Sequence, residues 1–247
     1  MKMTNKVRRT PTSRAVRQAF AWSVPCLTLG ATGTTLAEEA NSEATVLESV
    51  VVEGSGFSLP TEETGQYAPT DSQTATGLTL SARETPQSLS VVTNQQIEDF
   101  NLDSANDALQ ATPGVTVEKV ETDRTYYTSR GFDIQNFQID GLGAPFAYGN
   151  VQGEIDTAVY DRIEVIRGAN GLMSGSGSPS ATVNFIRKRP TPNTQAEVEL
   201  SAGSWDRRRV EGDVSGPLTE NKRVRGRLVV AGEQGESYLD RYERDRY

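Results

Sequence analysis

The sequence contains no histidine and only one cysteine among its 247 residues. Without histidine the chain cannot form a Ser-His-Asp triad, a Cys-His pair or a zinc-binding H-E-x-x-H helix, so these classes of enzyme are excluded. Apolar residues make up 35% of the chain, which is low for a globular protein and favours a small core with many turns. We therefore expect a protein that is not an enzyme.

Acidic residues are missing from residues 1–37, which hold six of the basic residues. A short apolar run at residues 19–29 and small residues up to Ala37 follow the basic stretch. This order is typical of a secretory signal peptide, here residues 1–37, because the apolar run is shorter than the roughly 20 residues of a membrane-spanning helix. Cleavage after Ala37 would remove Cys26, so the mature chain would contain no disulfide.

The remainder of the chain is strongly acidic, with 19 basic against 33 acidic residues, so it is expected to repel nucleic acid. Residues 38–83 are rich in Ser, Thr, Glu and Gly and are predicted to be a flexible N-terminal segment. The apolar run at residues 46–52 is the exception, since it has high strand propensity and no apolar surroundings. It is either an extended segment that adds to the sheet edge of another chain or the first strand of the following domain.

Residues 84–190 are predicted to form an α+β domain with interleaved elements. Short strands are expected at residues 89–92, 115–120, 126–132, 137–139, 162–167 and 181–187. Asn94 is predicted to cap one helix and Ser104 a second one that ends at Ala111, and a brief helix is expected at residues 156–160. The Gly- and Ser-rich loop at residues 168–180 lacks the G-K-[ST] of a phosphate-binding loop and is interpreted as a tight turn.

Small or apolar residues alternate with charged residues in three segments after residue 190. Val198 and Leu200 alternate with Glu197 and Glu199, and residues 209–215 and 223–230 follow the same rule. Strands with this pattern have one apolar and one charged face, and no further apolar element is present to cover the apolar faces. Segments of this kind are typical of a transmembrane β-barrel whose apolar residues face lipid.

Several segments resemble the plug domain of TonB-dependent outer-membrane receptors. They are ETPQSLSVVT (84–93), ALQATPGV (108–115), RGFDIQNFQIDG (130–141) and YDRIEVIRGANGLMSGSGSPSATVNFIRKRPT (160–191). AGSWDRRRVEGDVSGPLTE (202–220) resembles the first barrel hairpin of ferric-siderophore receptors, nearest to the ferripyoverdine and the ferric coprogen or rhodotorulic acid receptors. The resemblance implies an α+β plug domain, with a small mixed sheet and short helices, at residues 84–190. The first three antiparallel strands of a transmembrane β-barrel would follow at residues 191–247.

The resemblance implies TonB-dependent uptake of a ferric siderophore across the outer membrane. LESVVVEG (47–54) lies where the family has its TonB box, the segment that pairs by strand addition with TonB, which works with ExbB and ExbD. The implied TonB-binding residues are Leu47, Glu48, Ser49, Val50, Val51 and Val52. Only ten residues separate the predicted mature start from Glu48, so no domain for anti-sigma signalling is expected.

A ferric siderophore already satisfies its iron, so neither a metal ligand nor a cofactor is expected from the protein. Aromatic faces and a few hydrogen-bond donors would bind its organic shell. The resemblance implies such roles for Arg130, Phe146 and Tyr148, with Tyr126 and Tyr127 as further candidates. Cross-strand packing is the alternative role for the tyrosines, and a salt bridge is the alternative for Arg130.

Arg162 and Arg167 are implied to lock the plug to acidic residues of the barrel wall, which would lie beyond Tyr247. Three strands cannot close a barrel, so the barrel is expected to be incomplete and the chain alone is not expected to transport. Two alternatives keep part of this interpretation. One is a self-standing periplasmic siderophore-binding module, and the other is a TonB-dependent receptor for another cargo, such as cobalamin or haem.

Overall fold

The computed structural model describes residues 59–121, 124–144, 151–175, 178–237 and 239–247. All of them belong to the second of the two units into which the chain divides, residues 51–247. The predicted signal peptide and TonB box lie outside the described residues. Among the described residues, no helix is long and apolar enough to cross a lipid bilayer.

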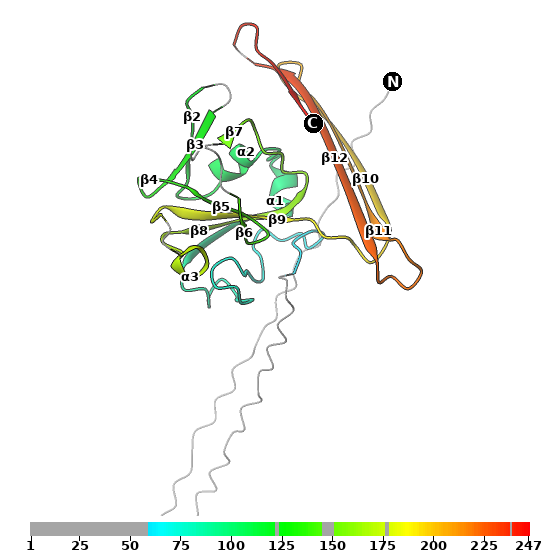
Figure 1. The fold of residues 1–247 in the computed structure, drawn as a ribbon. Coiled ribbons are helices and arrows are strands. Elements are labelled where there is room, and N and C mark those ends of the chain that lie inside the picture. Colours follow the sequence, from blue (N-terminus) through cyan, green and yellow to red (C-terminus); the bar gives the residue numbers. More distant parts are fainter. Residues whose placement is uncertain (1–58, 122–123, 145–150, 176–177, 238) are drawn as a thin grey trace, which may run out of the picture. The chain divides into compact units, whose positions relative to one another are not determined.

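A five-stranded sheet in the order β1-β8-β9-β5-β6 forms the centre of the plug (Figure 1). Its strands are β1 (Ser88–Thr93), β8 (Tyr160–Arg167), β9 (Ala181–Arg187), β5 (Asn136–Ile139) and β6 (Leu142–Gly143). Only β5 and β9 pair in parallel, so the sheet is mixed, as predicted. The inner strands β8 and β9 are almost entirely buried because both of their faces are covered.

Two short helices, α1 (Asn94–Asp99) and α2 (Ala105–Gln110), follow β1 in the chain. The predicted cap of α2 is confirmed, since the Ser104 hydroxyl accepts a hydrogen bond from the Asp107 amide at 3.2 Å. The cap of α1 is Thr93 and not Asn94. The Thr93 hydroxyl accepts from the Gln96 amide, and the Thr93 amide donates to the Gln96 side chain at 3.1 Å, which completes a capping box. A third helix, α3 (Gly171–Ser174), interrupts the loop that was predicted as a turn.

The brief helix predicted at residues 156–160 is wrong. Asp156 instead forms an isolated β-bridge with Ser104, and the Ala105 amide donates to the Ile155 carbonyl at 2.8 Å. Strand β8 begins at Tyr160. The segment makes only a single turn, in which the Tyr160 amide donates to the Thr157 carbonyl at 2.9 Å, and its backbone bonds at residues 155–157 go to residues 103–105.

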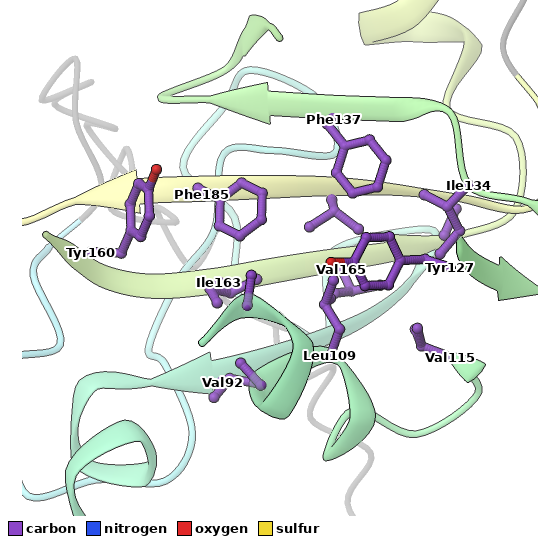
Figure 2. Packing of buried hydrophobic residues seen from close by; sticks show 14 of the residues in the cluster. Val92, Leu109, Val115, Tyr127, Ile134, Phe137, Tyr160, Ile163, Val165 and Phe185 are labelled. Carbon is purple, nitrogen blue, oxygen red and sulfur yellow. The ribbon is translucent and has the colours of Figure 1, made fainter. Parts of the chain in front are cut away.

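A second sheet contains β2 (Thr116–Lys119), β3 (Arg124–Ser129), β4 (Phe132–Asp133) and β7 (Val151–Gln152). The side chains of β3 alternate between half-buried and buried positions, so one face of this sheet packs onto the core. Figure 2 shows Tyr127 from this sheet with Phe137 and Val165 from the central one. The rings of Tyr127 and Phe137 lie 5.6 Å apart, and those of Tyr160 and Phe185 lie 5.1 Å apart.

Four antiparallel strands follow the plug in sequential order. They are β10 (Gln195–Ala202), β11 (Arg208–Pro217), β12 (Arg225–Glu236) and β13 (Glu243–Arg246). The pairing places Val198 opposite Gly212 and Gly212 opposite Val230, so small and apolar residues share one face. On that face the side chains are exposed, with 73% exposure for both Val198 and Leu200. β13 is a fourth strand beyond the three that the alternation predicted, because its charged sequence carries no apolar face.

We expect Phe185→Ala to destabilise the plug by about 3–5 kcal/mol, because the ring is 2% exposed and its removal leaves a cavity beside Tyr160. Urea unfolding of residues 59–190 measures this loss. Leu142→Ala is the control, since Leu142 is 75% exposed and its truncation should change stability by less than about 0.5 kcal/mol. Equal effects of the two substitutions would contradict the packing described above.

Candidate functional site

Arg130 lies at the turn between β3 and β4, with its side chain exposed and a backbone φ of 56°. Its guanidinium lies over Gly168, where an added Cβ would approach Nη1 of Arg130 to 2.8 Å. Gly168 has a φ of 101°, so both the space and the backbone favour glycine there. Arg130 forms no salt bridge with the residues that the structure describes, and its side chain is exposed.

The two candidate tyrosines point to opposite faces of β3. Tyr127 is 3% exposed, and its hydroxyl donates to Oδ1 of Asn106 at 2.5 Å. Burial raises the pKa of the Tyr127 hydroxyl well above its ordinary value. These contacts make Tyr127 a core residue, whereas Tyr126 is half-buried on the outer face opposite Glu118. Phe146 and Tyr148 lie outside the described residues.

Arg162 is held by neighbours in the plug itself. Its guanidinium contacts Asp161 and Glu164 at 2.7 Å each and donates to the Leu59 carbonyl at 3.1 Å. Burial alone would lower the pKa of Arg162, but the charges and hydrogen bonds of Glu164 and Asp161 together outweigh it and raise the pKa. Arg162 is therefore paired within the plug itself.

Arg167 fastens the edge strand β1 to the turn after α2. It donates to the hydroxyls of Ser90 and Ser88, at 2.7 and 2.6 Å, and to the Pro113 carbonyl. Locking of the plug by Arg162 and Arg167 against further wall residues stays a prediction.

Acidic side chains of the plug pair with arginines of the strands that follow it, a contact that sequence reasoning missed. Arg209 is bidentate to Asp156, at 2.5 and 2.8 Å, and Arg207 contacts Asp103. Glu154 accepts from Arg244 at 2.8 Å and from Arg246 at 3.1 Å. Asp103, Glu154 and Asp156 lie together because a β-bridge between Ser104 and Asp156 brings the two plug segments side by side.

Glu233 of β12 lies at the centre of the same charge cluster and is 1% exposed. It accepts hydrogen bonds from Arg207, Arg244 and Arg246 at 2.8, 2.5 and 2.8 Å. A buried carboxylate is costly without such partners, so these three arginines compensate for its loss of water. The only sequence signal for this cluster was the charged face of the strands, since its acids lie far away along the chain.

We name the cluster of Asp103, Glu154, Asp156, Arg207, Arg209, Glu233, Arg244 and Arg246 the plug lock. Burial alone would raise the pKa of Asp156 and of Glu154. Hydrogen bonds from Arg209 to Asp156 and from Lys119 to Glu154, together with the charges of nearby basic side chains, outweigh burial and lower both pKa values. Among the described residues, no group of three metal-binding side chains is found.

The comparisons with known proteins agree with this architecture. Residues 81–182 match the TonB-dependent receptor plug domain. The chain is 46% identical over 211 residues to the ferripyoverdine receptor of Pseudomonas aeruginosa, covering 83% of this chain and 26% of that protein. The chain belongs to the TonB-dependent receptor family. This confirms the resemblance, the fold class and the prediction that the chain is not an enzyme, since the family comprises outer-membrane transporters.

Solved structures of two receptors superpose on this chain. The ferripyoverdine-bound receptor of the Pseudomonas aeruginosa outer membrane gives a TM-score of 0.71 at 50% identity, over 75% of this chain and 25% of the receptor. The alcaligin outer-membrane receptor of Bordetella pertussis gives 0.67 at 50% identity, over 72% of this chain and 32% of the receptor. The chain thus spans about a quarter of the length of the curated ferripyoverdine receptors that it matches.

We expect acid to weaken the plug lock. A carboxylate whose pKa is lowered by folding contributes stability above its unfolded pKa, and this stability is lost as the pH falls through the folded value. For Asp156 and Glu154 the loss should therefore set in below about pH 4. Protease access to the plug, measured from pH 7 to pH 3 in a full-length receptor that begins with this chain, follows the change.

Asp156→Asn is the matched variant, because it keeps the shape of the side chain and removes its charge opposite Arg209. The variant should weaken the lock at pH 7 by about 1–3 kcal/mol and flatten the dependence on pH. A pH profile identical to that of the unsubstituted receptor would contradict this role of Asp156.

Proposed function

We propose that this chain forms the plug and the first wall strands of a receptor that takes up a ferric siderophore across the outer membrane. The observation that carries the proposal is the two-sided character of β10–β13. Val198, Leu200 and Leu228 are exposed on one face. On the other face Arg209 is buried against the plug acid Asp156, and Glu233 is buried against Arg207. A barrel wall needs this arrangement, with lipid outside and a plug inside.

The proposed cargo is a siderophore of the pyoverdine kind or a similar oxygen-rich chelate. Similarity to ferripyoverdine receptors and to the alcaligin receptor supports this class. Arg130 can donate in a planar fork to carbonyl or hydroxamate oxygens, and Tyr126 offers an accessible ring. Phe146 and Tyr148 remain proposed contacts on the ground of the family resemblance.

The proposed energy source is TonB, with ExbB and ExbD. Residues 47–52 would add as a strand to TonB, which then pulls on the N-terminal segment and displaces part of the plug. Membership of the TonB-dependent receptor family supports this partner. The alternative of a self-standing periplasmic module leaves the exposed apolar face of β10–β13 without a function.

Uptake of radiolabelled ferric pyoverdine tests the proposal in a receptor-deleted strain that produces a full-length receptor beginning with this chain. We expect Val51→Pro to abolish uptake and leave binding at the cell surface intact, because proline removes a backbone donor from the added strand. Val51→Ala, which keeps the amide, should retain uptake. Loss of binding together with uptake would count against the coupling role.

Arg130→Ala tests the ligand site. Removal of a charge-assisted donor should weaken binding of the ferric siderophore by roughly tenfold to a hundredfold, without changing the yield of the receptor. Arg83→Ala is the control, because Arg83 is also exposed but lies before β1. Equal affinities of the Arg130→Ala variant and the unsubstituted receptor would exclude Arg130 from the ligand site.

A further inference from the structure

Two adjacent residues near the start of the described chain are attached to different parts of the fold. Thr61 is bound to β8 of the plug, and Glu62 is bound to β12 of the wall. These attachments lie away from the plug lock and have no part in the proposed ligand site. Only eight residues lie between Val52, the last residue of the proposed TonB box, and Thr61.

Thr61 is 6% exposed and is held by Asp161, the second residue of β8. Its amide donates to both carboxylate oxygens of Asp161, at 2.8 and 3.0 Å, and its hydroxyl donates to the Asp161 carbonyl at 3.1 Å. The Glu62 amide donates to the same carboxylate at 2.9 Å. The Thr61 hydroxyl also accepts from the Asn94 amide at 3.1 Å, so this contact reaches α1.

Glu62 turns its side chain to the wall. Its two oxygens accept from Arg227 at 2.6 and 2.7 Å in a bidentate pair, and the same guanidinium contacts Asp213 of β11 at 2.5 Å. The side chains of Glu62, Arg227 and Asp213 are 17%, 11% and 10% exposed. A bidentate pair that is partly shielded from water is directional and stronger than a solvent-exposed salt bridge.

The segment that carries these contacts is bound by polar groups and has little apolar anchorage. In residues 59–87, Ala75 is the one buried apolar side chain, and the core cluster contains no residue of this segment. Ser72 and Thr74 donate to Glu164, which adds further polar contacts on the same strand. A cavity of about 830 Å³, lined by Glu62, Arg227 and Lys188 among others, lies beside the pair of Glu62 and Arg227. Water in it can replace these hydrogen bonds, so the segment can detach while the apolar core stays closed.

We propose that Thr61 and Glu62 form a clasp that must open before cargo passes. The clasp comprises Thr61, Glu62, Asp161 and Arg227, and it rests on the proposed function. Tension applied N-terminal to Leu59 reaches Thr61 and Glu62 before β1, the first strand along the chain, and it loads the plug and wall contacts at the same point. Glu62 and Arg227 are therefore coupling residues that touch neither ligand nor TonB.

A reversible cross-link tests the clasp. Glu62→Cys and Arg227→Cys are introduced into a full-length receptor that begins with this chain, and the two thiols are joined by a short, disulfide-containing bismaleimide. We expect cross-linking to reduce uptake of ferric pyoverdine at least tenfold, with surface binding unchanged and uptake restored by reduction. Asp213→Cys with Arg227→Cys is the matched control, because it joins two wall strands at the same place and leaves residue 62 free.

Each outcome is decisive. Equal uptake by the cross-linked clasp and the cross-linked control would overturn the clasp. If the receptor shows no TonB-dependent uptake even without cross-linker, the proposed function fails, and hydrogen exchange then decides on the clasp alone. In Glu62→Gln, the peptide covering residues 59–66 should exchange about tenfold faster while β8 and β9 stay protected. Unchanged exchange in that peptide would overturn the clasp independently of transport.

Discussion

The two-residue period of the β-strand determines where the functional charges of this chain lie. In β10–β13 it places Val198 and Leu200 on one face and Arg209 and Glu233 on the other, and the pairing register keeps these faces continuous across strands. Once the apolar face is assigned to lipid, the charges on the inner face need partners from neighbouring wall strands or from the plug. The plug meets that need at its acidic edge, so wall and plug are complementary in charge.

The same period divides β8 into two different faces. Ile163 and Val165 belong to the apolar core cluster, whereas Arg162 and Glu164 belong to a buried polar network that residues 59–74 complete. Removing the N-terminal segment would thus expose charges that water can solvate, and it would leave the apolar side intact. A central strand with one apolar and one polar face allows part of the plug to separate without the rest unfolding.

Local patterns in the sequence predicted many of the elements but not the contacts between them. The spacing from Ser104 to Asp107 predicted α2, and the alternation after residue 190 predicted the wall strands with their exposed apolar face. The helix expected at residues 156–160 was wrong because a backbone bridge to Ser104 satisfies that segment. Contacts such as that between Arg209 and Asp156 join residues 53 apart, and no local periodicity specifies them. The pair of Glu62 and Arg227, 165 residues apart, is of the same kind.

The plug lock and the clasp differ in their position along the chain, and this difference gives an order of release. Along the chain, Thr61 and Glu62 precede every strand of the central sheet. Asp156 of the plug lock comes after β1, β5 and β6 and just before β8. Tension applied at the N-terminus acts on the clasp first and reaches the plug lock only through the folded core. The plug lock can therefore hold the core against the wall while the segment at residues 59–80 leaves, because the two attachments share no residue. Partial opening then follows from the order of contacts along the chain and requires no difference in the strength of individual ion pairs.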